Sequence, residues 1–454
     1  MRLSGYQEEA VARLLEERKP TPTFGVFDVP GSGKTSVALN AHLQLDRFPA
    51  LITVPAHLVL QWRNEMIRWG IPEDTIGYCP RGMKPADRLT HLAEDNQFQI
   101  VSYNMWTNPR YRDILQHPVW SAYSFDESHR LRKGRKGRGG LWGPISQLRT
   151  KTRTKHMHTP LWLFTGTPVV KDATDVWPLL YFANPYRYSS RREFALEMCK
   201  TTQTPYALHI GPVRDREKFR NLLGKHSIRR TWDQIPELST LNRRDIQVPL
   251  ELDPVDLRRH RKIKKEYRDP LTDEALFSSS AMLHALRRLT ISDKVDAFTE
   301  VVEDTTGRWL CLAWYKDSAR LAYDRTKRTL AASGVVPNIV YIDGETSERE
   351  RRRAIDTYNR YPDTILVGTI GALETGLNLQ AGYQVAFLEQ HWLPSTNEQA
   401  VARVLRRGQE QPVLVYWFHC IKTYDMHVKR VSETRGANIE KDLDNFLEEE
   451  EWDE

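Results

Sequence analysis

The chain has few cysteines and no long apolar run. Its four cysteines among 454 residues lie far apart with no paired spacing, which argues against a zinc site or a disulfide scaffold and favours a reducing, intracellular setting. No stretch is apolar for long enough to span a bilayer, and residues 1–5 lack the apolar core of a signal peptide. We therefore expect a cytoplasmic protein with no membrane partner.

Acidic residues are missing from residues 130–155, which contain ten lysines and arginines and several glycines. Such a run cannot pack a core and repels itself unless anions are near. We interpret it as a mobile loop that meets nucleic-acid phosphates, and a solvated loop without a ligand is the alternative. Its candidate contacts are Arg130, Arg132, Lys133, Arg135, Lys136 and Arg138.

The formal net charge of +7 hides an asymmetry. Residues 440–454 hold nine acidic residues and one lysine, so the rest of the chain carries a net charge of +15. A basic body indicates a polyanionic partner, nucleic acid first, although solubilising surface charge would look the same in composition. We expect the acidic tail, residues 439–454, to be disordered and solubilising; mimicry of DNA and docking on a protein partner are the alternatives.

A glycine-bearing turn follows the first apolar run, residues 24–27. The turn reads Asp28-Val29-Pro30-Gly31-Ser32-Gly33-Lys34-Thr35, and helical character begins at Ser36. Strand, turn, Gly-Lys-Thr and helix are the parts of a phosphate-binding loop, in which backbone N–H groups cradle phosphates, the lysine reaches them and the threonine holds Mg²⁺. The strict pattern has glycine where Asp28 stands, so a chance glycine-rich turn is the alternative.

An acidic pair, Asp126-Glu127, follows another strand-like run, residues 123–125. In an ATPase the aspartate at such a strand end orients the Mg²⁺ shell and the glutamate polarises the attacking water. Two carboxylates in a turn are usually only solvated. Their position after a phosphate loop makes the catalytic interpretation the better one.

Strand-like runs alternate with helical stretches along the whole chain. The first set is 24–27, 50–55, 98–101, 123–125 and 161–164, and the second is 309–314, 339–342, 364–368, 384–388 and 413–418. This alternation predicts an α/β protein with two mostly parallel sheets flanked by helices. We expect an N-terminal ATP-binding domain (1–240), a linker with a basic helical segment (241–290), a C-terminal domain (291–438) and the tail. The basic helix, residues 257–268, either lines a DNA channel or is a solvated helix face.

Residues 399–409 place Arg403 and Arg406 three positions apart, which would put both on one face of a helix. A guanidinium can neutralise charge that develops on a transferred phosphoryl group. Arginine-rich helices are usually solvated, so this segment alone is a weak signal.

Taken together and in this order, the motifs resemble those of superfamily II helicases, and among them the Swi/Snf-type ATPases. That family's phosphate loop typically begins with aspartate. The matching segments are Asp28 to Thr35, Val54-Pro55 with Gln61-Trp62 and Glu65, Ser102-Tyr103, Asp126 to His129, Thr165 to Pro168, Asp343 to Thr346 with Arg349, Gly376 to Leu379, and Gln399 to Gln409. The resemblance spans nearly the whole chain, from Gln7 to about Cys420.

The resemblance implies two tandem RecA-like domains, ATP and Mg²⁺ as cofactors, and a compact bacterial or bacteriophage type of member. For ATP binding it implies Gln7, Gly31, Ser32, Gly33, Lys34 and Thr35, with Gln7 at the adenine edge and with Thr35 and Asp126 on Mg²⁺. For catalysis it implies Lys34, Asp126, Glu127, Arg403 and Arg406. For nucleic-acid contact it adds Gln61, Trp62, Asp343, Gly344 and Asn378, and for coupling Thr165, Gly166, Thr167 and Gln399.

This chain departs from the family pattern at three places. Leu373-Glu374 replaces a glycine pair, Arg407 stands where the family prefers an apolar residue, and Glu389 where many members have aspartate. The activity expected is translocation of a monomeric core on double-stranded DNA. Strand separation or annealing at forked DNA, and an ATP-switched clamp or scaffold, are the alternatives.

Overall fold

The computed structural model describes residues 2–79, 83–132, 141–149, 157–204, 208–239, 241–266, 279–305, 307–332, 338–373 and 377–443. The chain forms two compact units, which we call the N-terminal unit (residues up to 239) and the C-terminal unit (residues 240–437). Among the described helices, none combines the length and apolarity that crossing a membrane requires.

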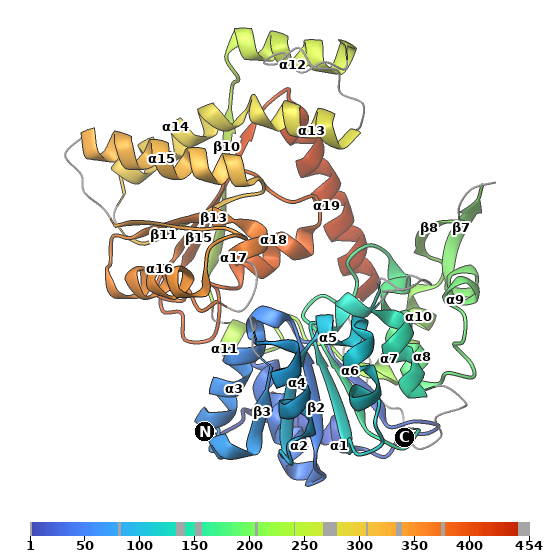
Figure 1. Ribbon diagram of the computed structural model, residues 1–454. Coiled ribbons are helices and arrows are strands. Elements are labelled where there is room, and N and C mark those ends of the chain that lie inside the picture. The colour runs from blue at the N-terminus through green and yellow to red at the C-terminus, as the bar shows by residue number, and fades with distance from the viewer. Residues whose placement is uncertain are drawn as a thin grey trace. The chain divides into compact units, whose positions relative to one another are not determined.

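The N-terminal unit is built on a seven-stranded sheet with the order β3-β4-β2-β5-β6-β1-β9, in which every neighbouring pair is parallel (Figure 1). Its strands are β1 (Thr23–Val26), β2 (Ala50–Val54), β3 (Ile76–Tyr78), β4 (Phe98–Ser102), β5 (Ala122–Asp126), β6 (Leu161–Phe164) and β9 (Ser227–Ile228). Its helices are α1 (Gly5–Leu15), α2 (Lys34–Leu45), α3 (Val59–Arg68), α4 (Pro85–Ala93), α5 (Tyr103–Thr107), α6 (Pro109–Leu115), α7 (Trp142–Ser146), α8 (Trp177–Ala183), α9 (Arg191–Met198), α10 (Arg216–Gly224) and α11 (Pro236–Ser239).

Side chains of this sheet alternate between two hydrophobic cores. In β6, Leu161 and Leu163 join the core formed with α5 to α10, whereas Trp162 and Phe164 join the core formed with α1, α2 and α3. Because helices cover both faces, the strands are apolar at nearly every position, and this is why they were visible in the sequence.

The segment between α8 and α11 leaves the sheet and returns to it. It contains α9, an antiparallel pair formed by β7 (Cys199–Gln203) and β8 (Leu208–Val213), and α10. The chain then returns as β9, which pairs with β1 beside the glycine-bearing turn. The sequence pattern does not predict β3, β7, β8 or β9.

The C-terminal unit has a six-stranded, wholly parallel sheet with the order β10-β15-β14-β11-β13-β12. Its strands are β10 (Arg243–Leu250), β11 (Trp309–Ala313), β12 (Ile339–Ile342), β13 (Ile365–Thr369), β14 (Gln384–Phe387) and β15 (Val413–Cys420). Its helices are α12 (Pro254–Glu266), α13 (Ser279–Arg288), α14 (Ile291–Glu303), α15 (Lys316–Ala332), α16 (Glu348–Arg360), α17 (Ile370–Leu373) and α18 (Pro394–Val401), and α19 (Tyr424–Leu443) begins in it. The predicted class, two tandem α/β units with mostly parallel sheets, is confirmed.

The side chain of His42 links α2 to the central strand β5. It is fully buried, and its Nε2 lies 2.7 Å from Ser124 Oγ, within hydrogen-bond distance. Burial lowers the pKa of His42 to about 3. The unfolded chain therefore binds a proton that the folded chain does not, so the stability that neutral His42 supplies is complete above its ordinary pKa and is lost as pH falls.

We expect the free energy of unfolding to fall by about 1.4 kcal/mol per pH unit from this group between about pH 6.5 and pH 4. His42→Gln should remove that slope, whatever its effect on absolute stability. Urea unfolding at several pH values measures it, with the exposed His158→Gln as the control. Equal slopes for wild type and His42→Gln would contradict the expectation.

Candidate functional site

Three loops meet at one edge of the N-terminal sheet. The strands β5, β6 and β1 are neighbours and parallel, so the segments that follow them leave from the same, carboxyl edge. Asp126 is the last residue of β5, Thr165 directly follows β6, and Asp28 lies two residues after the end of β1. Ligands of open parallel sheets bind outside this edge, which makes it the candidate site.

The glycine-bearing turn after β1 has the backbone of a phosphate loop. Gly31 and Gly33 have φ of 85° and 78°, in the left-handed region that favours glycine. At Gly33 a Cβ would also lie 2.5 Å from Gln7 Nε2. The turn runs directly into the N-terminus of α2 at Lys34, where free N–H groups and the helix dipole favour an anion.

Helix α1 holds this loop from one side. Gln7 is buried, its Oε1 accepts a hydrogen bond from Ser4 N (3.0 Å), and its Nε2 donates to Ser32 O (2.9 Å). The Tyr6 hydroxyl donates to the same carbonyl (2.7 Å). Within the loop, Lys34 Nζ donates to the carbonyls of Asp28 (2.7 Å) and Val29 (2.9 Å). An adenine contact by Gln7 stays a prediction.

Asp28 has a partner that sequence reasoning missed. Its side chain is 1% exposed and accepts from Arg230 Nη1 (2.8 Å) and from Arg230 N (2.9 Å). The second guanidinium nitrogen of Arg230 bonds Glu9 of α1 (2.9 Å), and the Arg230 Cζ lies 5.5 Å from the centre of the Tyr6 ring. Burial raises the pKa of Asp28, and the charge of Arg230 opposes that rise. The residue that replaces glycine in the loop pattern therefore forms a buried ion pair.

The acidic pair lies at the end of β5. Asp126 Oδ2 accepts from Trp62 Nε1 (2.9 Å), and Oδ1 accepts from Glu127 N (2.9 Å). Burial and then the charge of Glu127 raise the pKa of Asp126 to about 6. Glu127 has φ of 49°, a strained conformation for a residue with a side chain, of the kind that clusters at functional sites.

The position of Trp62 contradicts one expectation from the sequence. We expected it to contact nucleic acid, but its side chain is 2% exposed and binds Asp126, so it positions the acidic pair instead. Its neighbour Gln61 is exposed on α3 and remains a candidate for nucleic-acid contact.

His129 joins the acidic pair to the loop after β6. Its Nδ1 lies 3.3 Å from Glu127 Oε2 and 3.0 Å from Thr165 Oγ1. The same Thr165 oxygen accepts from Thr167 N (3.1 Å). The sequence predicts no role for His129, because a histidine in a turn gives no signal of its partners.

Gly166 brings that third loop against the phosphate loop. A Cβ at Gly166 would lie 2.8 Å from Pro30 Cγ and 3.1 Å from Pro30 N, so no other residue fits without a shift. Side chains and backbone from all three segments therefore form one contiguous cluster in the N-terminal unit.

We expect Gly166→Ala to weaken ATP binding by about tenfold or more, because the added methyl group would displace the phosphate loop at a cost of about 1–3 kcal/mol. Gly143→Ala is the matched control, since no atom lies within 4 Å of a Cβ there. Titration with a fluorescent ATP analogue compares the two. Equal affinities would show that Pro30 yields without disturbing the loop.

Arg403 and Arg406 do not lie on a helix, so the expectation that they share one helix face is wrong. Helix α18 ends at Val401, and residues 402–408 form turns in which Leu379 N donates to Arg403 O (3.1 Å). Gln409 Nε2 donates to the carbonyls of Gln380 (3.0 Å) and Gly382 (2.8 Å). Arg403 and Arg406 are therefore held in a turn that is bonded to residues 379–382, whereas Gln399 lies buried on α18.

Two further residues predicted to contact nucleic acid lie after β12. Asp343 is 5% exposed, and its carboxylate accepts from the backbone N of Glu345 and Thr346 (2.9 Å each). Burial raises its pKa, but those hydrogen bonds outweigh burial and the pKa is lowered. The Asp343 side chain therefore holds the turn together, which contradicts the expected contact of Asp343 with nucleic acid. Gly344 lies exposed on the same turn.

Of the remaining predicted contacts, Arg130 and Asn378 are exposed and Arg132 is half-buried. Arg406 Nη1 lies 3.5 Å from Asn378 Oδ1. Lys133, Arg135, Lys136 and Arg138 lie outside the described residues.

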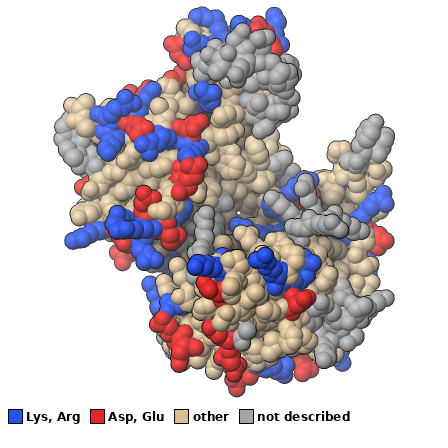
Figure 2. All heavy atoms as spheres, viewed as in Figure 1, with Lys and Arg blue, Asp and Glu red and all other residues tan. Residues whose placement is uncertain are grey.

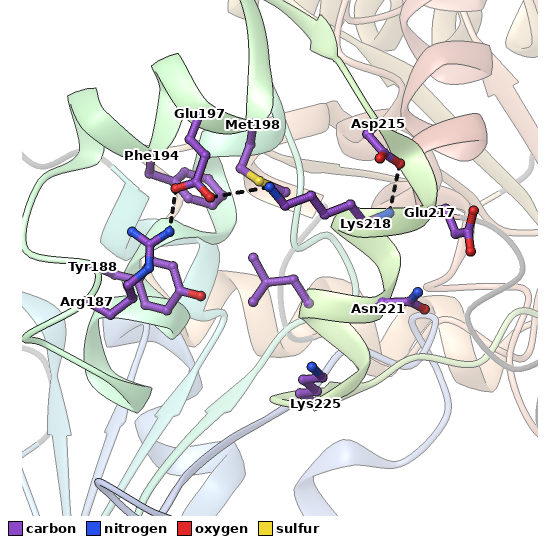
Figure 3. A pocket seen from close by; sticks show the side chains of 11 residues that line it. Arg187, Tyr188, Phe194, Glu197, Met198, Asp215, Glu217, Lys218, Asn221 and Lys225 are labelled. Carbon is purple, nitrogen blue, oxygen red and sulfur yellow. Dashed lines mark hydrogen bonds and ion pairs between the residues drawn. The ribbon is translucent and has the colours of Figure 1, made fainter.

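A cavity of about 570 Å³ opens elsewhere on the N-terminal unit, between α9 and α10 (Figure 3). Glu197 lies at its rim between Arg187 (2.7 Å) and Lys218 (3.5 Å). None of the predicted site residues lines this cavity.

The donors at the candidate site fit Mg²⁺ better than a structural metal. Within the described ranges, no three His, Cys, Asp or Glu side chains gather where they could hold an ion by themselves. Asp126 and Thr35 offer a carboxylate and a hydroxyl, and Mg²⁺ is usually bound by one or two such oxygens together with phosphates and water.

Two family models match consecutive parts of the chain. A family model described as the SNF2-related domain matches residues 6–291, and the helicase conserved C-terminal domain matches residues 293–408. An uncharacterized ATP-dependent helicase of Mycoplasma pneumoniae is 24% identical, over 97% of this chain and 42% of that protein. The SWI/SNF-related matrix-associated actin-dependent regulator of chromatin subfamily A-like protein 1 of Drosophila melanogaster is 23% identical, over 93% and 53%.

A third relative, the DNA annealing helicase and endonuclease ZRANB3 of Bos taurus, is 22% identical, over 91% of this chain and 39% of that protein. The chain thus spans about half or less of the length of these relatives. The Sulfolobus solfataricus SWI2/SNF2 ATPase core in complex with dsDNA aligns over 98% of this chain and 97% of that one, with a TM-score of 0.42 and 16% identity. Because the SNF2-related model matches more than half of the chain, the resemblance seen in the sequence is confirmed: the chain belongs to the SNF2-related family of helicase-type, ATP-dependent enzymes.

Proposed function

We propose that the chain is a DNA-dependent ATPase that uses ATP hydrolysis to translocate along double-stranded DNA. One observation carries the proposal: the phosphate loop, the acidic pair and the Thr165 loop lie at the carboxyl ends of three adjacent strands, in a chain of the SNF2-related family.

The residues of the N-terminal unit have separable roles in this proposal. Lys34 and the N–H groups of the loop bind the phosphates of ATP, and Gln7 and Tyr6 hold the loop in shape. Trp62 and the Glu127 N–H orient Asp126. Asp126 and Thr35 would hold Mg²⁺, which would neutralise charge on the phosphates.

Glu127 is the proposed general base. It accepts a proton from the attacking water, and His129 links it to Thr165 and Thr167, which we propose to transmit the nucleotide state. We further propose that Arg403 and Arg406 act on the transferred phosphoryl group, with Gln399 contributing to coupling.

DNA binding in this proposal is made to phosphates, so it should tolerate any sequence and weaken steeply with salt. Gln61, Arg130, Arg132, Gly344 and Asn378 are the described candidates. The annealing-helicase name of one relative supports a second candidate, strand separation or annealing at forks.

Strand-displacement assays separate these activities. A translocase should displace a third strand from duplex DNA without unwinding a forked duplex, and its ATPase should respond to duplex DNA more than to single strands or RNA. Unwinding or annealing would favour the second candidate. A DNA-stimulated ATPase with neither activity would leave an ATP-switched clamp.

A further inference from the structure

Helix α12 of the C-terminal unit is fixed by one face. Ile263 is fully buried in a cluster with Ala285, Leu286 and Leu289 of α13 and its end. His260 is 1% exposed, and its Nε2 accepts from Tyr424 N (3.0 Å) at the start of α19. The helix is therefore anchored along positions 260 and 263.

The five basic residues of α12 whose side chains the structure describes fall into two groups. Arg259 pairs with Asp256 (2.8 Å) and Lys262 with Glu266 (3.6 Å), each within the helix. Arg258, Arg261 and Lys265 are exposed, and none of the three has an ion-pair partner in the part of the chain that the structure describes.

The three residues without partners form a stripe. Their spacing of three and four positions places them on one face of the helix, and with 3.6 residues per turn that face lies roughly opposite to His260 and Ile263. The stripe rises by about 10 Å, comparable to three phosphate steps along one strand of DNA. The anchored face thus directs the stripe away from the unit.

Ion pairing is more extensive on α15, another basic helix of the same unit. On α15, Arg320 pairs with Asp324 (3.1 Å), and Arg325 pairs with Asp296 (2.9 Å). Helix α12 instead has six lysines and arginines against two acidic residues. In Figure 2, blue Lys and Arg atoms are visible where Figure 1 places α12, together with some red Asp and Glu atoms. Like charges at such spacings repel one another, and a polyanion removes that cost.

We infer that the stripe of Arg258, Arg261 and Lys265 binds the phosphate backbone of duplex DNA. This contact rests on the proposed function and adds to it a binding surface outside the family motifs. Because guanidinium and ammonium groups bind phosphates without reading bases, the contact is independent of sequence.

The test is the salt dependence of duplex binding by the full chain. The triple variant R258Q/R261Q/K265Q should lower the slope of log K against log salt by up to about 2.7, since each phosphate contact contributes about 0.9. We expect about tenfold to hundredfold weaker binding at low salt. ATPase activity without DNA should stay unchanged, because these residues are far in sequence from the nucleotide motifs.

The matched control is R320Q/K327Q/R328Q on α15, which removes the same charge from exposed residues of the same unit. It should change the slope by less than one. The charge-preserving variant R258K/R261K should keep the wild-type slope.

Three results would overturn the inference. The first is that the triple variant and the α15 control have equal slopes of log K against log salt for duplex DNA. The second is that the triple variant lowers this slope for duplex RNA but not for duplex DNA. If the wild type itself showed no salt-dependent binding to duplex DNA, the proposed function would fail and the contact with it.

Discussion

Replacing Glu127 by Gln should lower the rate of ATP hydrolysis by about 10²- to 10⁴-fold while leaving ATP binding within a few fold of the wild type. Glutamine has nearly the same shape but cannot accept a proton from the attacking water. Asp126, Lys34 and the loop glycines keep their contacts, because the Glu127 group that binds Asp126 is its backbone N–H. Turnover with saturating duplex DNA and titration with a fluorescent ATP analogue measure the two quantities separately.

Two further variants test whether Glu127 acts in catalysis and not in ATP binding. Lys34→Ala should show the opposite order of effects, with ATP binding lost first, because its ammonium lies within the phosphate loop. Glu217→Gln, at an exposed position of α10, should leave both quantities unchanged. Normal turnover in the Glu127→Gln protein would refute the catalytic assignment.

The sheet strands were predictable because burial on both faces makes them continuous apolar runs. The short edge strands were not. β3 has three residues and β9 has two, and such segments become strands only through the neighbour with which they pair. Most residues of the candidate site were predictable from the family motifs, because each motif specifies the residue types that follow a given strand.

Errors arose where a tertiary contact overrides local spacing. Positions 403 and 406 look helical in sequence, but the Arg403 carbonyl accepts from Leu379 N and the chain turns after Val401. Gln61 and Trp62 are adjacent in one motif, yet the turn of α3 buries Trp62 and exposes Gln61. A motif names residues without saying which of them faces the core.

Arg230 shows the limit of sequence reasoning most clearly. It stands 202 positions from Asp28, in a basic segment with Arg229, and nothing in that spacing identifies its partner. Only the pairing of β9 with β1 brings it to the phosphate loop. The aspartate that looked like a departure from the loop pattern is thereby explained as one half of a buried ion pair.

Arg230→Met should lower the free energy of unfolding of the N-terminal unit by about 3–5 kcal/mol, because it leaves the Asp28 carboxylate buried without its counter-charge. ATP affinity should fall as well, since the carbonyls of Asp28 and Val29 hold Lys34. Urea unfolding, with hydrogen exchange of peptides from β1 and β9, reports the stability of this unit.

The control is Arg13→Met, which removes an exposed ion pair between Arg13 of α1 and Glu16 and should cost at most about 1 kcal/mol. A double variant, Asp28→Leu with Arg230→Met, separates charge burial from general damage. Removing both charges should recover much of the stability lost in Arg230→Met, because no unpaired carboxylate remains. ATP affinity should not recover to the same extent if the pair also sets the shape of the loop. If the double variant is as unstable as the sum of its two single variants, the ion pair does not hold the loop, and Asp28 and Arg230 act independently.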